Sequence, residues 1–138
     1  MRYALIGFML VLGLSSAASA EPTAEQLRDT IRRYVATQEK NNGAFVIPDP
    51  KSGKGWLRTL SLVRVHERVG KTGDYYYSCT DMKDAKTGDE LDLDFDVRDT
   101  AGKFEVVAVR IHKDNGKPRY TYGDKDELIF LANNTSAN

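Results

Sequence analysis

The sequence predicts an α+β fold in which one N-terminal helix packs on an antiparallel meander sheet of four to five strands. Apolar residues recur at helical spacing after Thr23, and the rest of the chain consists of β-like segments cut by Gly, Asn, Asp and Pro. The first twenty residues form a separate segment, and its removal leaves 118 of 138 residues, which suits one domain with its own core. We expect this domain to span residues 21–132, followed by a disordered tail at 133–138.

The first twenty residues have the pattern of a secretory signal peptide. Arg2 precedes an apolar run from about Ala4 to Leu14, and small residues end the segment at Ala20. The run is shorter than the roughly 20 residues that a membrane span needs, and no cysteine stands at the cleavage point for a lipid anchor. We therefore expect a periplasmic or secreted protein that begins at Glu21 and has no membrane anchor; the alternative is an uncleaved anchor.

Composition limits the partners and the covalent chemistry. The chain has 20 Lys and Arg and 20 Asp and Glu, with both signs mixed, so charge gives no reason to expect nucleic-acid binding. Cys79 is the single cysteine, so the domain holds itself together without an internal disulfide. A lone thiol in a β-rich run is typical of a small buried hydrophobe; a reactive thiol or an intermolecular disulfide is the alternative.

Capping signals set the limits of the helix. Thr23 is a suitable N-cap, Gln26 completes a capping box, and Gly43 supplies the left-handed residue that ends the helix. The apolar stripe between them predicts a face that packs on the core, with a partner-binding face as the alternative. It consists of Leu27, Ile31, Tyr34 and Val35.

Turn residues separate the β segments. The two turns at Asp99–Lys103 and Asp114–Lys117 fix a register. The first, taken as a three-residue loop, pairs Phe95 with Val107 and Asp92 with Arg110; the second pairs Tyr120 with Ile111. Pro118 cannot donate to a ladder, so the last strand should be short or lie at an edge. The expected segments are 56–69, 75–82, 91–97, 104–113 and 119–122, after a short apolar run at 44–47.

In its order and size, this helix followed by a meander resembles the cystatin-like and nuclear-transport-factor-like α+β folds. The resemblance covers most of the mature chain and is one of architecture. The Gln-Val-Val-Ala-Gly motif of cystatin inhibitors is absent, so the resemblance implies no site residue.

Three carboxylates alternate with apolar residues along one predicted strand, at Asp92, Asp94 and Asp96. An EF-hand loop starting there would need Gly and Glu where the chain has Val97 and Lys103. Alternation sets the carboxylates about 7 Å apart, too far for one small ion to bind all three. We expect a solvated face partly neutralised by Arg110, with no metal and no cofactor; the alternative is a site for a divalent or cationic ligand at these carboxylates.

His66 and His112 are the two histidines of the chain and the candidates for acid–base chemistry. They fall on the first and fourth long segments, about 14 Å apart in a meander, so they should not share a metal. Either one could work with a carboxylate as acid and base, or serve as a surface or structural residue. Aromatic residues are the remaining binding candidates: Tyr75, Tyr76 and Tyr77, of which Tyr76 should face away from the other two, and Trp56.

No catalytic motif fits its required spacing. The sequence therefore predicts a small exported, non-catalytic binding or interaction module whose partner is an unidentified small molecule or protein. The alternative is a small periplasmic enzyme that uses an Asp/His acid–base pair in a cavity between helix and sheet. A pocket that holds a histidine within hydrogen-bond reach of a carboxylate would favour the enzyme.

Overall fold

The computed structural model describes residues 20–51 and 57–131. This part of the chain forms one helix, a six-stranded antiparallel sheet in the order β1-β2-β3-β4-β5-β6, and a separate two-stranded sheet, β7-β8. The predicted signal peptide as far as residue 19, Trp56 and the predicted tail lie outside the described residues. The elements are α1 (Ala24–Asn42), β1 (Phe45–Pro48), β2 (Leu57–Thr72), β3 (Tyr75–Asp84), β4 (Glu90–Thr100), β5 (Lys103–Asp114), β6 (Lys117–Pro118), β7 (Tyr120–Tyr122) and β8 (Leu128–Phe130).

The α+β class is confirmed, but the main sheet has six strands where four to five were expected. One additional strand is β1, which the short apolar run at 44–47 forms by pairing with β2. The other is β6, at the sheet edge, whereas the predicted last strand at 119–122 forms β7 and is not part of the main sheet. In the described chain no helix is long and apolar enough to span a membrane.

The helix begins and ends where its capping residues predict. The Thr23 side chain accepts from the Gln26 amide, and the Gln26 side chain accepts from the Thr23 amide, which completes the capping box. Gly43 ends the helix at φ 78°. Three stripe residues are buried against the sheet, Leu27, Ile31 and Val35, and Tyr34 packs at their margin.

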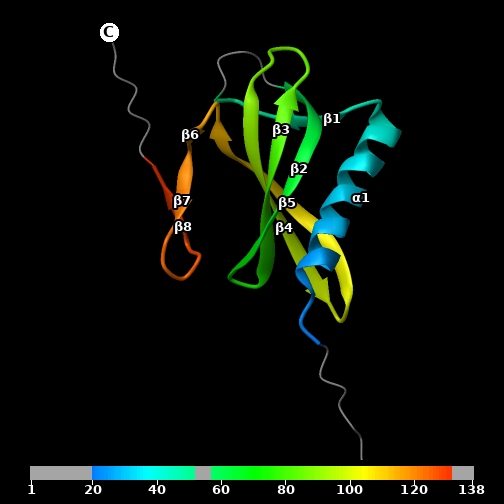
Figure 1. Cartoon of the computed structure of the whole chain (residues 1–138), viewed down its shortest axis with the longest axis vertical. Coiled ribbons are helices and arrows are strands. Elements are labelled where there is room, and N and C mark those ends of the chain that lie inside the picture. The colour runs from blue at the N-terminus through cyan, green and yellow to red at the C-terminus, as the bar shows by residue number, and fades with distance from the viewer. Residues whose placement is uncertain (1–19, 52–56, 132–138) are drawn as a thin grey trace, which may run out of the picture.

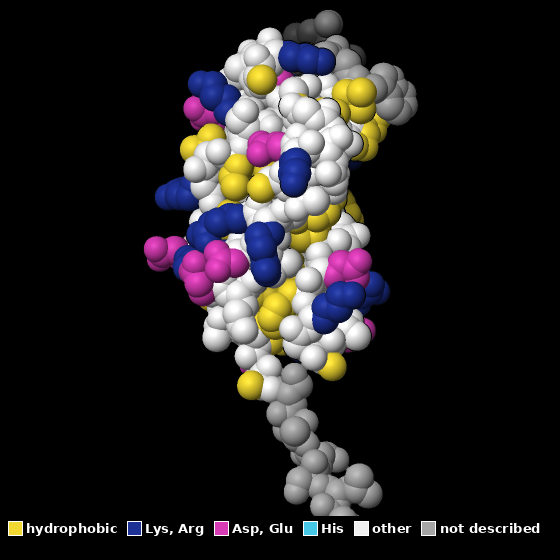
Figure 2. Space-filling model, turned by 90° about the vertical axis from the view of Figure 1, so that its right-hand side faces the viewer, with side chains coloured by type: hydrophobic (Ala, Val, Ile, Leu, Met, Phe, Trp, Pro, Cys, Tyr) yellow, Lys and Arg dark blue, Asp and Glu magenta, His cyan; other side chains and the backbone are white. Residues whose placement is uncertain are grey.

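The core lies between α1 and the inner face of the sheet (Figure 1). Phe95 is fully buried at its centre, and its ring meets those of Tyr34 and Phe45 at centroid distances of 6.1 and 6.0 Å. The β4 residues Leu91, Leu93 and Val97 are also almost completely buried. The molecular surface on the α1 side carries interspersed Lys, Arg, Asp and Glu with scattered apolar atoms, and no field of one sign (Figure 2).

The β4–β5 register differs from the expected one. The turn has two central residues, Ala101 and Gly102, both at positive φ, so Thr100 pairs with Lys103. Beyond the turn, β5 accommodates extra residues at Val107 and His112, each a bulge. The predicted partners are therefore wrong by two positions at Phe95 and by three at Asp92. The observed pairs are Phe95 with Val109, Asp94 with Arg110 and Asp92 with Lys113.

The pairing of Asp114 with Lys117 is confirmed, but the pairing of Tyr120 with Ile111 is wrong. Pro118 ends β6 because it has no N–H to continue the ladder. The Arg119 amide makes a last bond to the His112 carbonyl. The chain then leaves the sheet edge and forms the β7–β8 hairpin, which lies on the side of the sheet opposite α1 (Figure 1).

One end of the sheet is held by a buried ionic cluster. Arg58, 2% exposed, donates to carboxylates of the three turns at this end, namely Asp49, Asp84, Asp89 and Asp114. Arg119 also bonds to Asp49 and Asp114. Because every contact is charge-assisted and largely shielded from water, the cluster ties β6 and the start of the hairpin to the sheet.

Candidate functional site

A small pocket lies on the outer face of the sheet, beside the β7–β8 hairpin. Its volume is about 160 Å³, below the roughly 300–1,000 Å³ of pockets that hold drug-sized ligands. It brings together side chains from β2, β3, β4, β5 and β7, including both histidines and the cysteine. Its lining residues are His66, Arg68, Tyr77, Cys79, Asp94, His112, Lys113 and Tyr122.

The carboxylates of β4 are not the solvated face that alternation predicts. Asp94 is 0% exposed and Asp96 5%, and Asp92 is half-buried. The reason is the hairpin, which covers the outer face and which the periodicity of β4 cannot reveal. The expected neutralisation by Arg110 is confirmed for Asp96, with which Arg110 makes a bidentate ion pair.

Asp94 anchors the hairpin to the sheet. Its Oδ2 accepts the hydroxyl hydrogens of Tyr120 at 2.7 Å and Tyr122 at 2.5 Å. Its Oδ1 is buried but accepts no hydrogen bond from the residues that the structure describes. Buried polar atoms without a partner are rare because their desolvation is not compensated, so the two tyrosines satisfy the Asp94 carboxylate only in part.

The tyrosines of this face are kept neutral. Burial, and then the charge of Asp94, raise the pKa of both Tyr120 and Tyr122. Burial and a hydrogen bond from its hydroxyl to Asp126 raise the pKa of Tyr77 to about 12. The Tyr77 and Tyr122 rings stack at a centroid distance of 4.3 Å, which joins β3 to the hairpin.

A bulge in β2 presents His66. The residues 66–68 of β2 stand opposite Cys79 alone, between the pairs of Val65 with Thr80 and Val69 with Ser78. The buried Ser78 hydroxyl fixes this irregularity, because it lies 3.1 and 3.0 Å from the carbonyl oxygens of His66 and Arg68. Both side chains thereby line the pocket.

His66 is paired with a carboxylate, as the acid–base hypothesis requires. Its Nε2 lies 2.5 Å from Asp81 Oδ1. Burial alone would raise the pKa of Asp81, but hydrogen bonds from His66 and Arg64 outweigh it and lower that pKa. The carboxylate therefore stays ionised beside the imidazole.

A second bulge presents His112. It is the extra β5 residue between the pairs of Asp92 with Lys113 and Leu93 with Ile111. His112 Nδ1 lies 3.8 Å from Cys79 Sγ and 3.8 Å from Asp94 Oδ2. Its ring stacks on that of Tyr120 at 4.8 Å. The two histidines thus reach the same pocket from strands on either side of β3 and β4.

Cys79 is half-buried in the pocket wall and is a free thiol. Burial and the neighbouring Asp94 carboxylate raise its pKa strongly. Since the nucleophilic species is the thiolate, this environment opposes the alternative of a reactive cysteine as long as no cation is bound beside the sulfur. The prediction of a small hydrophobe fits only in part, because Cys79 faces a polar pocket and not the apolar core.

The three consecutive tyrosines separate as alternation predicts. Tyr76 packs against the core, Tyr75 is 37% exposed near the β2–β3 turn, and Tyr77 lines the pocket. The Tyr77 ring lies over Gly70, where an added Cβ would stand 2.3 Å from the ring. Gly70 is thus required by this close approach, and the β2–β3 turn lies beyond it, at Gly73 and Asp74.

A larger groove of about 330 Å³ lies between α1, β1 and β5, and it is lined by apolar residues with Gln38 and Tyr34. It holds no acidic or basic side chain, and neither histidine reaches it. The histidine–carboxylate pairs therefore lie on the face of the sheet opposite the space where the enzyme alternative placed them.

Comparison with protein-family models, with curated proteins and with solved structures gives no match. The resemblance to cystatin-like and nuclear-transport-factor-like folds stays a prediction. The function is therefore inferred from the residues of the pocket.

Proposed function

We propose that this protein is a small exported, non-catalytic binding module whose ligand site is the pocket beside the β7–β8 hairpin. The observation that carries the proposal is that two separate β-bulges deliver the two histidines of the chain to one pocket. Bulges are over-represented next to functional sites, and both histidines line the pocket on the face of the sheet away from the apolar core. The pocket volume of about 160 Å³ favours an ion or a ligand of few atoms.

Export is supported by the pattern of the first twenty residues. Ala20 and Glu21 are exposed and precede the Thr23 cap, so cleavage between them would leave α1 intact. N-terminal sequencing of the protein from a periplasmic or culture fraction should begin at Glu21. A mature protein that retains Met1 would contradict export with cleavage.

A thermal-shift screen of divalent metal ions and small metabolites tests the binding proposal. A ligand at 100 times its Kd adds about 2.7 kcal/mol to the free energy of unfolding. The screen is run on the mature chain, on Cys79→Met, which fills the pocket, and on Val63→Met, a matched change at a residue that is 65% exposed. We expect a hit that stabilises the parent and Val63→Met but not Cys79→Met. Equal stabilisation of all three, or no hit, would contradict the proposal.

A small acid–base enzyme is the second candidate, favoured by the 2.5 Å contact between His66 and Asp81. It predicts that a bound compound is chemically converted and that His66→Gln stops the conversion. A binding module predicts that mass spectrometry recovers the compound unchanged.

A further inference from the structure

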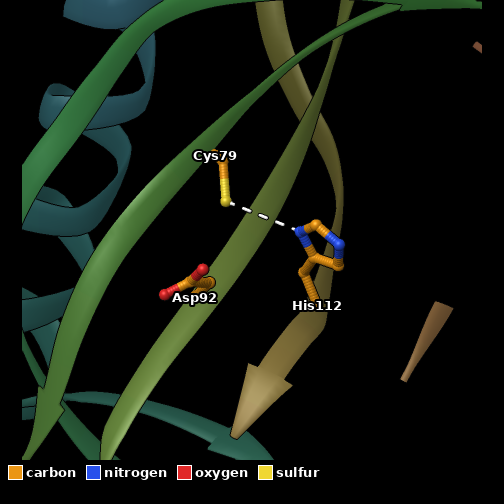
Figure 3. A group of neighbouring side chains, drawn as sticks. All are labelled: Cys79, Asp92 and His112. Carbon is orange, nitrogen blue, oxygen red and sulfur yellow. Dashed lines mark hydrogen bonds between the residues drawn. The ribbon is translucent and has the colours of Figure 1, made fainter. Parts of the chain in front are cut away.

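Three potential metal ligands converge from neighbouring strands at this pocket. Cys79 on β3, Asp92 on β4 and His112 on β5 each place one ligand atom within 4.8 Å of the other two (Figure 3). Cys79 and His112 line the pocket itself. His112 is the extra residue of its bulge and lies on the face of β5 opposite the core residue Ile111.

The spacing of the two strongest donors suits a tetrahedral metal. Zn–S and Zn–N bonds of about 2.3 and 2.05 Å give a sulfur–nitrogen separation of about 3.6 Å at the tetrahedral angle. Cys79 Sγ and His112 Nδ1 are 3.8 Å apart. An ion between these two atoms would be bound by sulfur and nitrogen without any movement of the backbone. Rotation of the Asp92 carboxylate would supply a third ligand.

The donor set selects the class of ion. Thiolate and imidazole suit zinc and neighbouring transition metals, whereas calcium and magnesium take oxygen ligands. Three protein ligands leave a fourth position open to water or to a small anion, as in zinc sites that bind an exogenous group.

A second, independent observation points to a cation at the same place. Asp94 is fully buried in the pocket wall, and within residues 20–51 and 57–131 its Oδ1 accepts no hydrogen bond. Its other oxygen lies 3.8 Å from His112 Nδ1. A positive ion held by His112 would offset the charge of this carboxylate, which the two tyrosine hydroxyls stabilise only in part.

We propose that Cys79, Asp92 and His112 bind a zinc-like divalent transition-metal ion. The inference rests on the proposed function, because it names the ligand class of the same pocket. Lys113 competes with the ion, since its Nζ lies 2.8 Å from Asp92 Oδ2. The Lys113 side chain is 38% exposed, so it can turn into solvent when the ion enters.

Cobalt(II) titration of the reduced mature protein under oxygen-free conditions tests the proposal. We expect a thiolate-to-cobalt charge-transfer band that saturates at one ion per chain and is displaced by zinc(II). Cys79→Ser should remove the band, and Asp92→Asn and His112→Gln should each weaken binding by about tenfold or more. Lys113→Gln should tighten it about two- to fivefold, because the competing ion pair is lost.

His66→Gln is the matched control, because it changes the other histidine of the pocket and leaves the three ligands intact. It should bind cobalt like the parent. Far-UV circular dichroism checks that each variant is folded. The absence of a thiolate band in the parent would overturn the proposal, as would His66→Gln weakening cobalt binding as much as His112→Gln.

The outcome separates the two proposals. If cobalt gives no thiolate band while an organic compound still stabilises the parent but not Cys79→Met, the metal inference is wrong and the binding module stands. If neither a metal ion nor a compound binds in a way that depends on Cys79, both are wrong.

Discussion

The two faces of the central sheet are both covered, but by different kinds of contact. On the inner face, β4 presents Leu93 and Phe95 to the apolar stripe of α1. On the outer face, the same strand presents Asp94 and Asp96 to tyrosine hydroxyls and a guanidinium. Apolar packing requires complementary shape, whereas the contacts on the outer face require a hydrogen-bond or ion-pair partner for each polar group. A ligand site is easier to build on the second face, because its polar groups are already held in fixed positions away from bulk water.

The inner face should give the largest loss on mutation. Phe95→Ala removes a fully buried ring that contacts Tyr34 and Phe45. We expect it to lower the free energy of unfolding by about 3–5 kcal/mol, measured from urea midpoints. A loss below about 1 kcal/mol would mean that this face is not the core.

The outer face should give a smaller but clear loss. Asp94→Ala leaves the Tyr120 and Tyr122 hydroxyls without their acceptor, and we expect a cost of about 1–3 kcal/mol. Asp124→Ala, at an exposed position of the hairpin turn, is the control and should stay within about 0.5 kcal/mol of the parent. Equal effects of the two changes would indicate that the hairpin does not cover Asp94.

Alkaline pH should weaken the outer face selectively. The pKa of Tyr77 is raised from 10.0 to about 12, so above about pH 10 the unfolded chain loses this proton before the folded one does. The stabilisation is complete below pH 10 and is lost as the pH rises towards 12; Tyr120 and Tyr122 act in the same direction. Urea unfolding between about pH 9 and pH 11.5 should show the decline. A stability that stays constant over this range would contradict it.

Tyr77→Phe should have the smallest effect. The change removes the hydroxyl that donates to Asp126 at 2.9 Å but keeps the ring that stacks on Tyr122. We expect a cost of about 0.5–1.5 kcal/mol and a shallower alkaline decline than in the parent. A cost as large as that of Asp94→Ala would make this bond, and not the buried carboxylate, the main anchor of the hairpin.

Local signals account for the part of the fold that could be predicted from the sequence. The Thr23 capping box, the helical stripe and the alternation of β4 each depend on residues close together in the chain, so they identify α1 and the inner face. The β4–β5 register differs from the predicted one because a two-residue turn and the bulges at Val107 and His112 shift the pairing. The first bulge also changes which β5 residues face inward: Val106 packs against the core, whereas Val107, the predicted partner of Phe95, is 37% exposed.

The site could not be predicted, because it depends on contacts between distant segments. From the sequence, Asp94 is predicted to be exposed to solvent, because its burial depends on the distant hairpin residues Tyr120 and Tyr122. Cys79 and His112 are 33 residues apart, and the pairing of β3 with β4 and of β4 with β5 brings them together. Pro118 is a local signal for a short strand or an edge strand, which β6 is, but it does not indicate that the chain then folds back over the outer face.

Proton NMR of the histidine rings tests the central claim, that the pocket beside the hairpin is the binding site, most directly. The chain has two histidines, and both line this pocket, so their Cε1–H resonances report on it without isotope labelling. We predict that zinc(II), and any compound that raises the melting temperature of the mature protein, shifts or broadens one or both resonances in a saturable way. A ligand that stabilises the protein and leaves both resonances unchanged would place the binding site elsewhere and contradict the account.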